Sequence, residues 1–239
     1  MKPTQSAPAG GILRHSLFLL LLLAVAACKD DKYHYPSVKL EFVTLLSDEE
    51  GKVATLIPDM GDPLRVSLDR TASTFTPSST LRALSNYETI GSGTTATAVI
   101  YSLQSPIVPT PKPASDEAFK DGIKHDPVNV TSIWMGRDYL NMILNLKVDT
   151  GKGHVFGIVE DTTELETAGV VTLSLYHDSA GDAEHYNRSA YLSIPLKQYQ
   201  VLPRPSAPIT IKFKYYTYDA DGLATESDKY AKEGFVYLP

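Results

Sequence analysis

Three histidines, His154, His177 and His185, lie among acidic residues in the second half of the chain and are the first candidates for chemistry. A zinc site needs three or four imidazole, thiolate or carboxylate ligands that converge on one point. The spacing of these histidines matches no zinc signature. We therefore expect no bound metal and no cofactor.

A short acidic segment, Asp219-Ala220-Asp221-Gly222, resembles half of a calcium loop. An EF-hand loop would also need a third acidic residue before the glycine and a glutamate at its end. Asp and Gly are equally the residues of a tight turn. The sequence favours a hairpin turn here and leaves calcium binding open.

Catalytic patterns are weak throughout the chain. Paired carboxylates occur at 116–117 and 160–166, but a glycosidase needs two carboxyl groups facing each other across a cleft. The chain has no Gly-x-Ser-x-Gly motif. We expect no catalytic residues and no enzyme, with a metal-dependent hydrolase as the least favoured alternative.

A run of tyrosines offers a surface for binding. Tyr215, Tyr216 and Tyr218 place rings on both faces of one expected strand. Exposed aromatic rings can stack on sugars, whereas tyrosine is also simply a good strand former. These three residues are the candidate ligand-facing aromatics.

The single cysteine, Cys28, ends an apolar run, 17–27, that follows Arg14. As a helix this run rises roughly 16 Å, which is too short for a hydrocarbon core of about 30 Å. A basic flank and a short apolar core are typical of a secretory signal peptide. Val25-Ala26-Ala27-Cys28 resembles a bacterial lipobox, which predicts cleavage between Ala27 and Cys28 and lipidation of Cys28.

The residues after the cysteine predict the location of the mature protein. Lys29, Asp30 and Asp31 resemble the surface-export signal of Bacteroidota outer-membrane lipoproteins, and they equally suit a solvated tether. Removing residues 1–27 takes away two of the 22 basic side chains, which leaves 20 basic and 28 acidic ones, or −8. We expect a lipid-anchored protein of the outer membrane, exposed at the cell surface, which does not bind nucleic acid.

Short alternating runs separated by turn residues predict an all-β fold. Such runs fill residues 36–104 and 114–239, and four prolines occupy the segment 105–113 between them. We expect a five-stranded OB-like barrel followed by an immunoglobulin-like β-sandwich. The expected organisation is a signal peptide at 1–27, a lipidated cysteine and acidic tether at 28–35, the barrel at 36–104, an extended Pro-rich linker at 105–113 and the sandwich at 114–239.

Four segments resemble the NigD-like lipoproteins of Bacteroidota. They are Leu81-Arg82-Ala83-Leu84-Ser85-Asn86-Tyr87-Glu88, Trp134 with Asp138-Tyr139-Leu140-Asn141, His154, and Tyr191-Leu192-Ser193-Ile194-Pro195-Leu196. The resemblance implies the same two-domain lipoprotein and no enzymatic activity that could be carried over.

These observations favour a non-catalytic binding or display protein whose partner is a glycan or an envelope protein. A structural accessory subunit of an envelope assembly, with no small-molecule ligand, is the alternative. Two triplets, Asp161-Thr162-Thr163 and Asp178-Ser179-Ala180, also resemble acceptor sites for O-glycosylation. The sequence does not specify the oligomeric state.

Overall fold

The computed structural model describes residues 35–149, 153–200, 207–227 and 229–239. It divides into two units, Met1–Ser37 and Val38–Pro239, and the second unit contains all the described strands. Five residues of the predicted export segment lie outside the described part of the chain: Ala27, Cys28, Lys29, Asp30 and Asp31. Among the described residues, no helix has the length and apolar character needed to cross a membrane.

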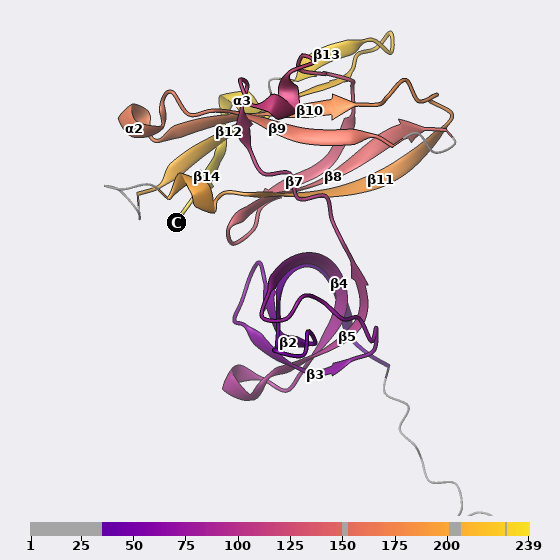
Figure 1. The fold of residues 1–239 in the computed structure, drawn as a ribbon, viewed down its shortest axis with the longest axis vertical. Coiled ribbons are helices and arrows are strands. Elements are labelled where there is room, and N and C mark those ends of the chain that lie inside the picture. The colour runs from indigo at the N-terminus through magenta and orange to yellow at the C-terminus, as the bar shows by residue number, and fades with distance from the viewer. Residues whose placement is uncertain (1–34, 150–152, 201–206, 228) are drawn as a thin grey trace, which may run out of the picture. The chain divides into compact units, whose positions relative to one another are not determined.

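The first part of the second unit is a closed five-stranded barrel, which confirms the all-β prediction (Figure 1). Its strands follow the order β1-β2-β3-β5-β4. Their bounds are β1 Val38–Ser47, β2 Val53–Pro58, β3 Leu64–Asp69, β4 Thr80–Ile90 and β5 Thr97–Gln104, with a 3-10 turn η1 at Gly93–Thr95. Alternate residues of each strand point inward, and Val43, Leu45, Leu56, Tyr87 and Ile100 fill the interior.

The second part is a β-sandwich of two sheets. One sheet has the order β13-β12-β10-β9-β6, with β14 also pairing with β12, and the other has the order β11-β8-β7. The strands are β6 Lys112–Pro113, β7 Asn129–Met135, β8 Tyr139–Val148, β9 Val155–Asp161, β10 Val170–Asp178, β11 Tyr186–Pro195, β12 Ile209–Tyr218, β13 Ala224–Ser227 and β14 Phe235–Tyr237. Short helical turns are η2 Glu117–Phe119, α2 Leu165–Ala168, η3 Lys197–Tyr199 and α3 Lys229–Lys232.

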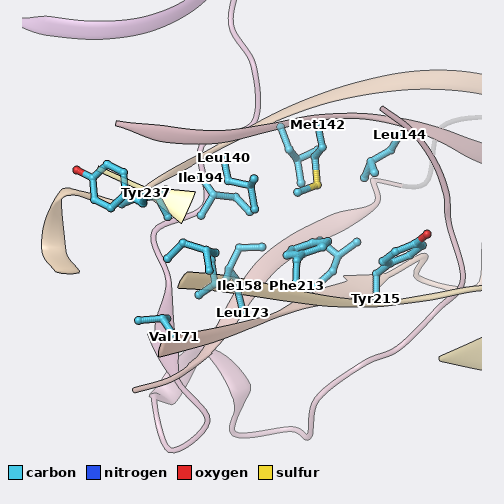
Figure 2. Close-up of a cluster of buried hydrophobic side chains, with 14 of the residues drawn as sticks. Leu140, Met142, Leu144, Ile158, Val171, Leu173, Ile194, Phe213, Tyr215 and Tyr237 are labelled. Atoms are coloured by element: carbon cyan, nitrogen blue, oxygen red, sulfur yellow. The ribbon is translucent and has the colours of Figure 1, made fainter. Parts of the chain in front are cut away.

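The sandwich core forms where the inner faces of the two sheets meet. Figure 2 shows Leu140, Met142 and Leu144 of β8 facing Leu173 and Phe213 of the opposite sheet. All five side chains are fully buried. The alternation of apolar residues in β8 therefore gives this strand one core face, as the sequence predicted.

Two features of the sandwich differ from the sequence-based expectation. Strand β7 was not predicted, because a register shift between Val130 and Ser132 interrupts its alternation. The sequence predicted that the Pro-rich segment is a connector and not a strand, yet it pairs with the sheets. Ile107 forms a parallel bridge with Leu192 of β11, and Lys112–Pro113 pairs with β9.

A buried polar group connects the barrel to the sandwich, and we call it the junction cluster: Arg82, Asp59, Thr44, Asn141 and Ser193. The guanidinium of Arg82 donates to both carboxylate oxygens of Asp59, at 2.7 and 2.5 Å. It also donates to Ser193 Oγ at 2.8 Å, Asn141 Oδ1 at 3.0 Å and Thr44 Oγ1 at 3.3 Å. All five N–H groups of the guanidinium are therefore used.

Aromatic rings enclose the junction cluster. The Arg82 guanidinium lies 4.0 Å from the ring centroid of Tyr139 and 5.6 Å from that of Phe42. Phe42 in turn packs edge-to-face against Trp134 and Tyr191. Because the Arg82 side chain is only 3% exposed, its charge depends on these partners for compensation.

Candidate functional site

A pocket of about 350 Å³ lies beside the N-terminal half of β11, and we call it the β11 pocket. Leu146 and Val148 of β8, Phe156 of β9 and Ala190 of β11 supply its apolar lining. The remaining lining comprises Ile107 of the linker, Gly153, Tyr191 and the polar residues Gln104, Ser105, Asp149, His154, Asp182, Arg188 and Ser189. An apolar surface with a few polar groups is the usual composition of a ligand site.

The pocket adjoins an open sheet edge, because β11 is the outermost strand of its sheet. Ile107 of the linker covers part of this edge: its N–H donates to the Tyr191 carbonyl at 2.8 Å, and its carbonyl accepts from Ser193 N–H at 2.9 Å. Tyr191 and Ser193 thus direct their backbone groups away from β8. Since this direction alternates along a strand, Asn187 and Ser189 continue the same outward row.

The outward row is exposed. Residues 186–189 are all solvent-exposed, and no backbone hydrogen bond from the described part of the chain reaches the outward groups of Asn187 or Ser189. Unpaired strand edges can template an added strand. The site therefore combines backbone donors and acceptors that no described backbone group uses with a pocket that can take a side chain.

One wall of the pocket contains a hydrogen-bonded chain of side chains, which we call the histidine chain. His177 Nδ1 lies 2.9 Å from the Asp126 carbonyl oxygen, and His177 Nε2 lies 2.9 Å from His154 Nδ1. His154 Nε2 lies 3.4 Å from Asp182 Oδ2. The antiparallel pairing of β9 with β10 brings the two histidines together, because it sets His177 opposite Phe156.

The carboxylates around this chain favour their charged forms. The backbone N–H of Asp149 bonds to Asp182 and, with His154, holds the pKa of Asp182 below its usual range. Burial would raise the pKa of Asp126, but the Ser179 hydroxyl and N–H outweigh it and lower that pKa. Burial lowers the pKa of the His177 imidazole. The histidine chain thus ends on the Asp126 backbone carbonyl at one side and on the Asp182 carboxylate at the other.

The structure brings together two of the three candidate histidines. His185 lies apart, 66% exposed, with its Nδ1 3.1 Å from Asp149 Oδ1. Asp219 accepts from the N–H groups of Asp221 and Leu223 and thereby forms a tight turn. Within the described residues, no group of three or more His, Cys, Asp or Glu side chains could hold a metal ion.

The candidate ligand-facing tyrosines do not form one binding surface. Tyr215 is 7% exposed and packs in the sandwich core, so the expectation that it faces a ligand is wrong. The Tyr216 ring stacks on His125 with centroids 4.4 Å apart. Tyr218 donates to Glu184, and burial raises its pKa to about 12. The alternation of the strand sends Tyr215 to the opposite face from the other two.

A larger hollow of about 550 Å³ lies on the barrel beside β2 and β3. Its acidic residues are engaged in local turns. Asp48 accepts from the N–H groups of Glu50 and Lys52, and Asp69 accepts from the Thr71 N–H and hydroxyl. We therefore regard this hollow as a weaker candidate than the β11 pocket.

The fold of this chain is similar to those of known proteins. The family model for the NigD-like C-terminal beta sandwich domain matches residues 110–226. A crystal structure of a NigD-like immunity protein from Bacteroides caccae ATCC 43185 is similar over 87% of this chain and 100% of that one, with 62% identity and a TM-score of 0.78. This chain belongs to the NigD-like family.

More distant structures share the fold alone. A candidate toxin-related protein of Parabacteroides distasonis ATCC 8503 has 16% identity and a TM-score of 0.63, with 80% of this chain and 92% of that one covered. A candidate lipoprotein of Bacteroides fragilis NCTC 9343 has 14% identity and a TM-score of 0.56, with 80% and 97% covered. Comparison with curated proteins finds no match.

Three of the four segments that indicated the NigD-like family from sequence converge in space, while the fourth, His154, lies in the histidine chain. Arg82, Asn141 and Ser193 belong to the junction cluster, while Trp134 and Tyr191 pack around it. Sequence reasoning gave these segments no common role, since they are far apart along the chain. The NigD-like residues singled out in the sequence therefore mark mainly how barrel and sandwich are joined.

Proposed function

We propose that this NigD-like chain is a lipid-anchored, non-enzymatic protein of the outer-membrane surface that binds another protein. The observation that carries the proposal is the exposed edge of β11 beside the β11 pocket. An extended segment of a partner can pair its backbone with Asn187 and Ser189 and place an apolar side chain against Leu146 and Phe156. Strand addition of this kind gives affinity through backbone bonds and specificity through pockets.

The neighbouring part of the same edge supports this mode of binding. The linker residue Ile107 already pairs with Tyr191 and Ser193 as an extended segment does. A partner strand would continue this row toward Asn187. A protein partner also agrees with the described tyrosines, because the Tyr215 ring is buried and therefore is not available to a sugar.

The homologous Bacteroides caccae protein is described as an immunity protein. Immunity proteins neutralise toxins by binding them, and some of these complexes are among the tightest known. A toxin-like protein is accordingly the first partner to test for this chain.

The anchoring half of the proposal rests on the sequence around Cys28. Two or three acyl chains on this cysteine would hold the protein on the membrane, whereas one chain binds only marginally. The mature charge of −8 would keep the body away from an anionic lipid surface. We expect Cys28→Ser to leave the membrane fraction, and we expect added protease to cleave the wild type on intact cells. Protection from protease would place the protein on the periplasmic side.

Site-specific photo-crosslinking tests the binding half. A photoreactive amino acid replaces Ser189 at the open edge or, as a control, Val236, which is 61% exposed on β14. We expect a discrete crosslinked protein from position 189 and none from position 236. Equal products at both positions, or products only with a second copy of the chain, would contradict the proposal.

A backbone variant shows whether the edge itself is used. Proline at position 189 removes an outward N–H, and edge strands tolerate proline where no ladder bond is lost. We expect Ser189→Pro to abolish capture of the partner and Ser189→Ala to keep it, at equal thermal stability. Capture by both variants would show that binding does not use strand addition.

A further inference from the structure

The two imidazoles of the histidine chain face each other directly. The ring centroids are 5.0 Å apart and the facing nitrogens, His154 Nδ1 and His177 Nε2, are 2.9 Å apart. The nitrogens therefore lie close to the line that joins the two rings. This is the geometry of an N–H···N hydrogen bond, in which one nitrogen carries the proton.

Two neutral imidazoles satisfy the two 2.9 Å contacts of this arrangement and leave the 3.4 Å contact between His154 and Asp182 without a donor. The chain has three hydrogen-bond positions: His177 to the Asp126 carbonyl, His177 to His154, and His154 to Asp182. The carbonyl and the carboxylate only accept, so all three positions need an N–H from an imidazole. Two neutral imidazoles supply two N–H groups. A third N–H, on His154 Nε2, requires one additional proton and one positive charge.

The contact that fails without this proton can be identified. His177 is 2% exposed, and its Nδ1–H is required by the buried carbonyl contact at 2.9 Å. Losing the N–H between the rings would leave two lone pairs facing each other at 2.9 Å. The remaining option places the Nε2 lone pair of His154 against the Asp182 carboxylate, across the longest contact of the three. Deprotonation therefore weakens the His154–Asp182 contact.

Burial is the largest effect on the pKa of His177 and lowers it, as does the neighbouring His154, whereas the nearby acidic groups favour a proton on the pair. Asp126, Asp178 and Asp182 are the acidic groups that act on the two rings, and Lys124 acts on Asp126. The Phe156 ring stacks flat on His177 and excludes water from that side. These groups face the chain from β9, β10 and the adjoining loops.

We propose that His154 and His177 together bind one proton, and that this proton closes the wall of the β11 pocket by holding Asp182 against His154. The proton comes from water and returns to it, so no other reactant is needed. The claim that this proton regulates partner binding rests on the proposed function, whereas the claim that the pair binds a proton does not. The pocket wall would be closed in mild acid, and it would be looser at a higher pH, where the pair has lost its proton.

Imidazole nitrogen NMR of the mature lipidated protein in detergent, labelled with ¹⁵N-histidine, tests the proton count without any partner. We expect His177 to remain the Nδ1–H tautomer from pH 5 to 8, while His154 loses its Nε2 proton. An Nε2–H tautomer of His177, or two histidines that titrate independently, would overturn the proposal.

Hydrogen exchange tests whether the proton closes the wall. The Asp149 N–H donates to Asp182 at 3.0 Å, so its protection factor reports how firmly that carboxylate is held. From pH 5 to 8 we expect this protection factor to fall about tenfold, as for the loss of a hydrogen bond to a charged group. Asp182→Asn should remove the pH dependence, because the variant has no carboxylate for a His154 lone pair to oppose.

A control variant tests whether His185, and not the pair of His154 and His177, causes the pH dependence. His185 also contacts Asp149, and His185→Gln should leave the pH dependence of the Asp149 amide unchanged. If His185→Gln abolishes it, the exposed pair is the sensor and the proposal is wrong. If exchange behaves as expected but crosslinking from position 189 is equal at pH 5 and 8, regulation of binding is overturned, while partner binding itself stands.

Discussion

Removing the Arg82 guanidinium should destabilise the barrel–sandwich junction more than the rest of the protein. Arg82→Ala leaves the Asp59 carboxylate, only 11% exposed, without its cation. It also leaves Asn141 and Ser193, both fully buried, without one donor each. Breaking a buried ion pair by removing one partner costs about 3–5 kcal/mol of unfolding free energy. That is a large fraction of the 5–15 kcal/mol typical of a domain.

Two further variants calibrate this expectation. Arg82→Lys keeps the charge, but its ammonium has three donors in place of five, so we expect a loss of about 2 kcal/mol. Lys112→Ala removes an exposed ion pair with Asp116, whose N–O distance is 3.0 Å, and should change stability by less than about 1 kcal/mol.

Urea unfolding provides the assay, because Trp134 is the single tryptophan and packs against Phe42 at the junction. Its fluorescence reports the junction, and far-ultraviolet circular dichroism reports the sheets of both domains. In the wild type we expect the two transitions to coincide, and in Arg82→Ala we expect the fluorescence transition to come first. A loss for Arg82→Ala as small as that of Lys112→Ala would refute this account of the junction.

Two further predictions concern a packed glycine and a half-buried carboxylate. A Cβ at Gly136 would overlap the Asp59 carboxylate, so Gly136→Ala should lose about 2 kcal/mol in urea unfolding, whereas Gly153→Ala, which meets open space, should not. The lowered pKa of Asp126 contributes stability above about pH 4, and this stability is lost as the pH falls through the folded-state value. Ser179→Ala removes a hydrogen bond to that carboxylate and should move the acid-unfolding midpoint to higher pH; an unchanged midpoint would show that the bond contributes nothing.

The sequence predicted the strands well where alternation was regular. In β8 the residues Leu140, Met142 and Leu144 recur at every second position, and the structure buries all three. Alternation alone does not tell which face of a strand meets the core. Tyr215 illustrates this limit, because the sequence placed rings on both faces of its strand without distinguishing the buried one.

The candidate site depended on strand pairing that the sequence does not reveal. His154 and His177 are 23 residues apart and meet only through the register of β9 with β10. The Arg82 contacts to Asn141 and Ser193 span 59 and 111 residues. Resemblance to the NigD-like proteins drew attention to these segments, but only the pairing of the sheets shows that their side chains touch.

Amide hydrogen exchange across β11, with the crosslinked partner bound and absent, is the most direct test of the proposed binding mode. We expect the partner to slow exchange at Asn187 and Ser189 and to leave the β14 control at Val236 unchanged. Slowing elsewhere with no change at Asn187 and Ser189 would contradict strand addition at the β11 edge.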